Sequence, residues 1–150
     1  MNVKKGLIYN EIKENIDYRI EEIKHAISIQ KESLETASEA TAGDKHNTSR
    51  AMMHIEEEKL SQQLAQFLKL KKIINKISPN KITTSITLGS LIETNNGWLH
   101  ISIPLGKLII DKFEVMVVSL ISPIGQALNN KEVGDSVKFN GKRWEILHVF

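Results

Sequence analysis

Two long segments with a narrow apolar stripe, one on each side of Gly43, constrain the fold of this chain more than any other feature. In both segments large apolar residues recur every three, four or seven positions, and most residues between them are charged or amide side chains. These apolar positions are Leu7, Ile12, Ile16, Ile20, Ile23, Ile27 and Leu34 in the first segment, and Met53, Leu60, Leu64, Phe67, Leu70, Ile74 and Ile77 in the second. Such spacing predicts two long helices that each bury one narrow face, as in a coiled coil.

The short connection between the two segments predicts a helical hairpin. Gly43 is a good helix terminator, and Asn47, Thr48 and Ser49 are suitable N-caps for a second helix. The second helix should end before Pro79, because proline disfavours helical backbone in the residue preceding it. Two helices joined by a short turn pack antiparallel. If residues 7–40 are all helical, the first helix is about 50 Å long.

From residue 82 onward the pattern changes to short β-type runs separated by turn signals. Asn95-Asn96-Gly97 and Asn140-Gly141 are typical of tight hairpins, and Ser122 to Leu128 is typical of one short helix with proline in its first turn. The strands are expected at residues 86–94, 98–103, 108–110, 113–121, 136–139 and 143–150. We therefore predict an α+β protein, with a helical hairpin at 1–78 and a small antiparallel β domain at 79–150.

Composition narrows the classes of function. The 150 residues carry a formal net charge of +2 and contain no cysteine. The lack of cysteine excludes a disulfide framework, a thiol nucleophile and the usual structural zinc sites. No apolar run approaches the roughly 20 residues that span a bilayer, and no signal peptide is apparent. We expect a cytoplasmic protein without a membrane partner.

An enzyme in its own right is not indicated. The phosphate-binding pattern Gly-x-x-x-x-Gly-Lys-Ser/Thr is absent, and no serine, histidine and aspartate occur in a convincing catalytic context. His46 and Asp44, with His54 further along, are too few for a transition-metal site, and solvated polar side chains are the better interpretation. Trp98 and Trp144 are expected in the β-domain core or in a groove on its surface.

The order of these elements, together with two motifs, resembles a known family. Ser122-Pro-Ile-Gly-Gln-Ala-Leu128 is followed closely by Lys131-Glu-Val-Gly-Asp135, and Gly43-Asp44 lies between the two helices. This combination is similar to the bacterial transcript-cleavage factors GreA and GreB over nearly the whole chain. The resemblance implies a transcription elongation factor that binds RNA polymerase, an FK506-binding-protein-like β domain, and the DNA-binding context of transcription.

The resemblance also implies roles for particular residues. Ser122, Pro123, Ile124 and Gly125 would belong to the domain that docks on polymerase. The helical hairpin would enter the polymerase's secondary channel, and an acidic tip would help to hold a Mg²⁺ ion at the polymerase's own active centre. The nascent RNA 3′ end would be approached only indirectly. The protein itself would then be no enzyme, would hold no cofactor when isolated, and is expected to be a monomer.

The tip segment, residues 43–48, departs from the family pattern at one position. That pattern is Gly-Asp, two residues, then Glu-Asn, whereas here Gly43, Asp44, Lys45 and His46 precede Asn47. Because Asn47 stands at the position of the glutamate, Asp44 is the only acid of the tip. An amide oxygen such as that of Asn47 binds Mg²⁺ more weakly than a carboxylate does. Two functions therefore stay open: promotion of RNA cleavage, or modulation or inhibition of polymerase without cleavage.

Each of these residues also has a purely structural interpretation. Asp44 follows a glycine in a turn, where aspartate often accepts bonds from local backbone N–H groups, and Asn47 and Thr48 are expected to cap the second helix. A group of lysines at the end of that helix complements the helix dipole, or alternatively forms a basic patch facing RNA: Lys69, Lys71, Lys72 and Lys76. A coiled-coil scaffold and, by analogy of fold, a prolyl isomerase are the remaining alternatives.

Overall fold

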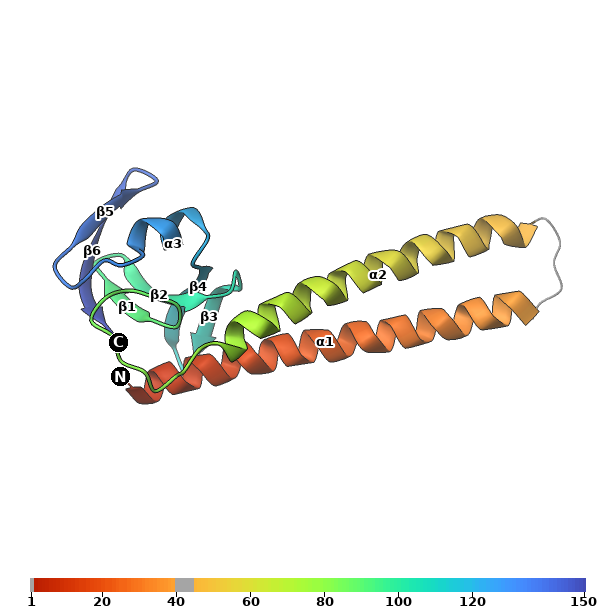
Figure 1. Ribbon diagram of the computed structural model, residues 1–150, viewed down its shortest axis with the longest axis horizontal. Coiled ribbons are helices and arrows are strands. Elements are labelled where there is room, and N and C mark those ends of the chain that lie inside the picture. Colours follow the sequence, from red (N-terminus) through yellow and green to blue (C-terminus); the bar gives the residue numbers. More distant parts are fainter. Residues whose placement is uncertain (1, 40–44) are drawn as a thin grey trace. The chain divides into compact units, whose positions relative to one another are not determined.

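The computed structural model describes residues 2–39 and 45–150, without the side chains of residues 2, 37–39 and 45–49. Its elements follow the order expected from the sequence, two long helices and then six strands with one short helix (Figure 1). The helices are α1 (Asn2–Glu39), α2 (Lys45–Asn75) and α3 (Pro123–Leu128). The strands are β1 (Leu91–Thr94), β2 (Gly97–Ser102), β3 (Gly106–Ile110), β4 (Phe113–Ser119), β5 (Ser136–Phe139) and β6 (Lys142–Val149).

The chain divides into two compact units, each described by itself. One comprises Met1–Lys13 with Lys72–Phe150, and the other comprises Glu14–Lys71. The first unit thus contains the sheet together with the beginning of α1 and the end of α2. The boundary predicted at residue 78 differs from this division, and the domains 1–78 and 79–150 stay a prediction.

Helices α1 and α2 meet along the apolar stripe that the sequence predicts. Every stripe position from Ile12 to Leu34 and from Met53 to Ile77 is buried or half-buried. The prediction is wrong at Leu7, which is 46% exposed, and the neighbouring Ile8 is buried instead. The charged and amide residues between them are mostly exposed, which confirms the helical period. Large apolar residues outside the stripe, such as Ile29 and Ile55, remain more than half exposed.

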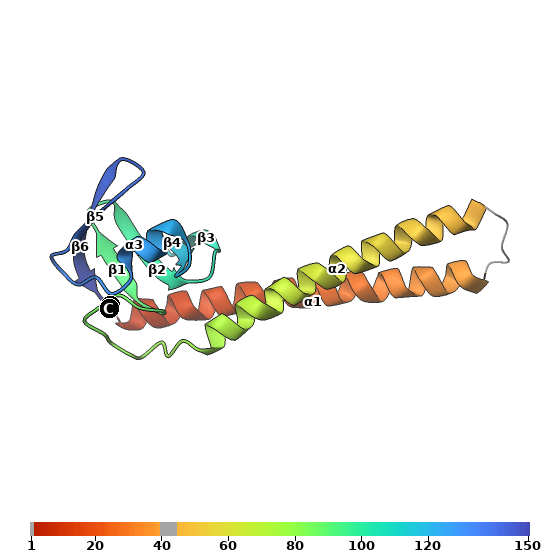
Figure 2. The ribbon, with the colours of Figure 1, turned by 45° about the horizontal axis from the view of Figure 1, so that its top comes forward.

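Contacts between the helices confirm that they run antiparallel. In the unit Glu14–Lys71, Lys71 Nζ lies 2.8 Å from Asp17 Oδ1, and Gln30 Nε2 donates to the Met53 carbonyl at 3.2 Å. Residues progressively later in α1 therefore meet residues progressively earlier in α2, as two views of the ribbon show (Figures 1 and 2).

The six strands form one sheet in the order β3-β4-β2-β1-β6-β5. All neighbouring pairs are antiparallel except β2 and β4, which are parallel with Trp98 opposite Val115. The antiparallel sheet predicted from the sequence is therefore confirmed for four of the five pairs and is wrong for this one. The chain passes from β2 to the edge strand β3 and returns as β4, which pairs between β3 and β2. Because β3 and β4 are antiparallel, β4 runs in the same direction as β2. The FK506-binding-protein-like assignment of this sheet stays a prediction.

The sheet buries side chains on both faces. Because side chains alternate along a strand, Leu99 and Ile101 of β2 point to the face where they pack with Ile124 and Leu128 of α3. His100 and Ser102 point to the opposite face and are also buried. On that face, Lys4 Nζ of α1 lies 4.4 Å from the centre of the Phe113 ring.

Two tight turns have left-handed backbone. Asn140 and Gly141 have φ of 51° and 73°, which confirms the hairpin predicted from Asn-Gly. Asp111 and Lys112, between β3 and β4, have φ of 46° and 68° without any glycine. The sequence therefore gives no strong signal for this second turn.

None of the helices in the described part of the chain combines the length and the apolarity that crossing a membrane requires.

His100 generates a prediction about stability and pH. Burial, followed by the positive charge of Lys5, lowers the pKa of His100 from 6.5 to about 4. Between these two values the unfolded chain binds a proton that the folded chain does not. The free energy of unfolding should therefore fall as pH falls through this window, by up to roughly 3 kcal/mol.

The measurement is urea unfolding at several pH values from 7 to 4, with the variant His100→Gln. We expect His100→Gln to lack most of the wild-type loss of stability, and His148→Gln to retain it, since His148 is exposed and pairs with Glu93. Equal slopes for the wild-type protein and His100→Gln would contradict the prediction.

Candidate functional site

The segment between α1 and α2 contains the predicted tip. Gly43 and Asp44 lie outside the described residues. Lys45, His46, Asn47 and Thr48 lie in the first turn of α2, which begins at Lys45. The expectation that Asn47 or Thr48 caps this helix is therefore wrong, because their backbone is already helical.

The four lysines predicted as a basic patch have different surroundings. Lys71 pairs with Asp17, so part of its charge is neutralised within the hairpin. Lys69 and Lys72 are exposed, and Lys72 is the basic residue of the last turn of α2. This position agrees with the dipole interpretation. Lys76 follows α2 and lines a cavity near the sheet.

The segment predicted to dock on polymerase forms the beginning of α3. Ser122 is the N-cap: its hydroxyl accepts from Gly125 N at 3.1 Å and donates to the Ser119 carbonyl at 2.6 Å. Pro123 occupies the first helical position, where its missing N–H leaves no partner unsatisfied. Ile124 is buried in the core cluster under the helix.

Gly125 is required by a close backbone approach. A Cβ built on this residue would lie 2.1 Å from the Ser119 carbonyl oxygen and 2.9 Å from that of Leu120. No side chain fits there without moving the backbone. Ser122, Ile124 and Gly125 therefore all have structural roles, and Pro123 is the member of the motif that stays exposed.

Ile121, which precedes the cap, is 81% exposed and was not among the residues predicted for the docking segment. An apolar residue before an N-cap usually packs on the fourth helical residue. Here that residue is Gln126, whose side-chain amide donates to the Ile121 carbonyl at 2.9 Å. The polar residue at position 126 is the sequence signal that leaves Ile121 without an apolar partner. We call Ile121 and Pro123 the α3 edge.

An apolar groove of about 450 Å³ lies between α3 and the sheet. Strand positions on the α3 face contribute Leu99, Met116 and Val118, and α3 contributes Ile124. Trp98, Phe139 and Trp144 also line the groove. The expectation for the two tryptophans is confirmed, since Trp144 also packs against the core cluster. With few polar atoms, the groove suits apolar side chains rather than a charged ligand.

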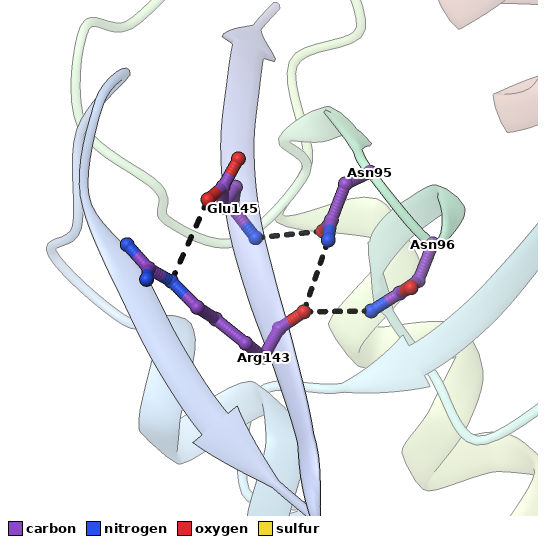
Figure 3. Close-up of polar contacts among 4 residues, drawn as sticks. All are labelled: Asn95, Asn96, Arg143 and Glu145. Carbon is purple, nitrogen blue, oxygen red and sulfur yellow. Dashed lines mark hydrogen bonds and ion pairs between the residues drawn. The ribbon is translucent and has the colours of Figure 1, made fainter.

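The turn between β1 and β2 contributes Asn96 to the lining of this groove. Side chains of the turn are tied to β6 (Figure 3). The Asn95 side chain accepts from Glu145 N at 2.7 Å and donates to the Arg143 carbonyl at 3.1 Å. The Asn96 amide donates to the same carbonyl at 3.0 Å. The Arg143 side chain in turn lies 3.5 Å from the Glu145 carboxylate. Two asparagine side chains thus continue the pairing of β1 with β6 beyond the end of the strand.

Metal-binding residues do not gather in the part of the chain that the structure describes. Within it, no group of three or more histidine, aspartate or glutamate side chains is placed to hold a metal ion. The Mg²⁺ role expected for Asp44 concerns a residue outside that part.

Comparison with known proteins finds likeness in structure but no match by sequence. No known family profile matches the sequence, and no curated protein matches it. Among solved structures, the transcription factor Gfh1 is similar over 91% of this chain and 92% of its own, with 17% identity and a TM-score of 0.37.

The close approach at Gly125 generates a prediction. Gly125→Ala should lower the free energy of unfolding by roughly 3 kcal/mol, because the added methyl group overlaps two backbone carbonyls that cannot move independently. Gly6→Ala is the matched control. It lies within α1 with nothing within 4 Å of the added atom, so it should gain roughly 0.5–1 kcal/mol from helix propensity. Urea unfolding followed by circular dichroism measures both, and a Gly125→Ala variant as stable as the wild-type protein would contradict the geometry.

Proposed function

We propose that this chain is a transcription factor that binds RNA polymerase, with the helical hairpin inserted into the polymerase and the sheet held on its outside. In the cleavage form of this proposal, the tip segment promotes hydrolysis of backtracked RNA by the polymerase's own active centre. The chain performs no chemistry alone. It acts by placing a side chain in another protein's catalytic cavity.

The observation that carries the proposal is the hairpin. Helices α1 and α2 are 38 and 31 residues long and pair along one seam, so most of their surface is exposed and little of it forms a core. Such a pair gains little stability for its length, since an isolated seam buries few apolar atoms. The length of the helix pair is better explained if its tip must reach a site inside a partner protein. The motifs at residues 43–44 and 122–135, which resemble those of GreA and GreB, give the polymerase as the partner.

The proposed chemistry at the tip involves one carboxylate. Mg²⁺ in phosphoryl-transfer sites keeps several waters and takes one or two protein carboxylates. A second Mg²⁺ ion supplies stabilisation of the attacking and leaving oxygens in phosphodiester hydrolysis. In this proposal Asp44 contributes one ligand, and the polymerase contributes the others. Asn47 contributes only a neutral oxygen, which weakens the site.

The α3 edge is the proposed contact of the sheet with polymerase. Of the motif Ser122 to Gly125, only Pro123 is exposed, and the neighbouring Ile121 exposes most of its side chain. An exposed apolar pair on a well-fixed helix start suits a protein interface. The groove between α3 and the sheet supplies further apolar surface next to Ile124.

The second candidate function is modulation or inhibition of polymerase without cleavage. It is favoured by Asn47, since the tip then lacks the second acid that the family pattern has. Both functions share the same partner and the same mode of insertion. They differ only in whether the tip completes a Mg²⁺ site.

A cleavage assay separates the two functions. In stalled complexes of bacterial RNA polymerase with Mg²⁺, the cleavage form predicts that the protein shortens the RNA and that Asp44→Ala removes at least about 90% of this activity, since the sole tip ligand is lost. Glu22→Ala, which removes an exposed carboxylate of α1, is the control and should keep full activity.

Asn47→Glu extends the same assay. Binding without cleavage by the wild-type protein, together with cleavage gained by Asn47→Glu, would establish the modulator form and locate its cause. Failure to bind polymerase at all would overturn both forms of the proposal.

The docking contact is tested separately from the tip. Ile121→Asp should weaken binding to polymerase by about tenfold or more, because it places a charge at the centre of the proposed apolar contact. Ile109→Asp is the matched control, since Ile109 is 62% exposed on the edge strand β3 and lies outside the α3 edge. Both variants should fold as the wild-type protein does. Equal affinities of the two variants would show that the α3 edge is not the contact.

A further inference from the structure

A polar cavity of about 220 Å³ lies beside the turn that precedes β1, within the unit formed by Met1–Lys13 and Lys72–Phe150. Three lysines line it: Lys5 from α1, Lys76 from the end of α2, and Lys81 from the segment that follows. Four hydroxyl side chains complete most of the lining, and no acidic residue is among the described residues that form it. The cavity therefore combines positive charge with hydrogen-bond donors.

Lys5 is the unusual member of this group. Its side chain is only 3% exposed, and its ammonium donates to the Lys81 carbonyl at 2.6 Å. An ammonium has three donors, and no other partner of Lys5 occurs within the described residues. Burial lowers the pKa of Lys5, and its charge contributes to lowering the pKa of His100. A buried charge is normally paired, yet the described side chains provide no carboxylate for this one.

The other two lysines add charge that is also unpaired by the protein. Neither Lys76 nor Lys81 forms an ion pair with any residue that the structure describes. Their side chains are exposed, so they can move toward a ligand at little cost. Together with Lys5 they direct three positive charges at one small volume.

The hydroxyl groups are held by a fixed turn. Thr87 N donates to Ser90 Oγ at 3.0 Å, and Ser90 N donates to the Thr87 carbonyl at 3.1 Å. Gly89, inside this turn, has φ of 91°, and a Cβ there would lie 2.8 Å from Ile77 Cγ2. The hydroxyl groups of Thr87 and Ser78 have no hydrogen-bond partner in the described part of the chain, so both can donate to a ligand.

A purely structural role explains only part of this arrangement. One hydrogen bond from Lys5 to the Lys81 carbonyl ties α1 to the segment after α2, but a neutral side chain could make it without burying a charge. It also leaves unexplained why two further lysines and the free hydroxyl groups meet at the same cavity without any acid. An anionic ligand accounts for all of these features, since it would pair with Lys5 and use the remaining donors.

We propose that this cavity binds a phosphate group, with Lys5 as the buried cation and Lys76, Lys81, Ser78 and Thr87 as further donors. Its volume is below the roughly 300–1,000 Å³ typical of pockets for drug-sized ligands, so only a small oxyanion fits inside. That group is either inorganic phosphate or the terminal phosphate of a nucleotide whose remainder lies outside. The proposal does not depend on the polymerase function.

The test uses the full chain and inorganic phosphate as the probe. Calorimetric titration with sodium phosphate, in sodium chloride adjusted to constant ionic strength, should show saturable binding with a Kd of about 1 mM or tighter. The unfolding temperature should rise over the same concentrations, because a ligand that binds only the folded state stabilises it. The absence of both effects would overturn the proposal.

Variants identify the cavity as the binding site. Lys5→Met should weaken phosphate binding by about tenfold or more, since a charge-assisted hydrogen bond is lost. Without phosphate it should unfold at the same or a higher temperature than the wild-type protein, because an unpaired buried charge is removed. Lys138→Met, which removes an exposed lysine of β5 that forms no ion pair with a described residue, should bind phosphate as the wild-type protein does. Unchanged binding by Lys5→Met would overturn the proposal.

Two further arms complete the test. Lys81→Gln keeps the carbonyl that Lys5 needs and should still weaken binding by about threefold or more, so the proposal remains testable if Lys5→Met does not fold.

A nucleoside triphosphate that binds more tightly than phosphate, with the same dependence on Lys5 and Lys81, would assign the site to a nucleotide. Equal affinity would assign it to free phosphate. Binding of an RNA oligonucleotide alone, with no response to either small phosphate, would overturn the proposal.

Discussion

In a pair of helices, each apolar side chain of the seam packs against only one other helix. This limits how far the apolar side chains of the long N-terminal part of the chain can be buried. Ile12, Ile16 and Ile20 of α1 are buried, as are Ile74 and Ile77 at the other end of the partner segment. Between residues 21 and 70, no described side chain is buried, and the seam positions are at best half-buried. Burial therefore concentrates where the start of α1 meets the end of α2, and the outer seam, toward the end of α1 and the start of α2, contributes less apolar area per residue.

The helical hairpin is the part that the sequence predicts best, because a repeat of three and four requires no knowledge of distant residues. The short helix and the Asn140-Gly141 turn are equally local, and both are confirmed. The parallel pairing of β2 with β4 could not be predicted in this way, since it depends on β3, which follows β2 in sequence, pairing at the far side of β4. Asp111 and Lys112 adopt left-handed backbone without glycine, which no turn signal indicates.

The candidate sites were only partly predictable, for a related reason. Lys5 lies three and seven residues before the buried Ile8 and Ile12, so helical spacing places it on their side of α1, although a lysine is ordinarily expected to be exposed. Its burial results from residues after position 76, which the periodicity of α1 does not include. Asn47 illustrates the opposite error: its residue type favours a cap, yet α2 already begins at Lys45. The role of Asp44 stays a prediction.

The residues of the motif at 122–128 have identifiable structural roles. Ser122 caps α3, Ile124 fills the core and Gly125 permits a backbone approach that no other residue allows. Substitution at any of these positions would disturb the folding of α3 before it altered a contact with a partner. A match at these residues therefore indicates a shared way of starting this helix.

The decline of burial along the hairpin has a consequence for how cooperatively α1 behaves. A helix whose inner turns are fixed by buried isoleucines and whose outer turns have only half-buried contacts does not open as a single unit. Its outer turns can unwind and reform while the inner turns stay intact, so local opening there requires far less free energy than global unfolding. A partner that encloses the outer turns would bury their half-buried side chains. Its binding free energy would be less favourable by the free energy needed to suppress that local opening.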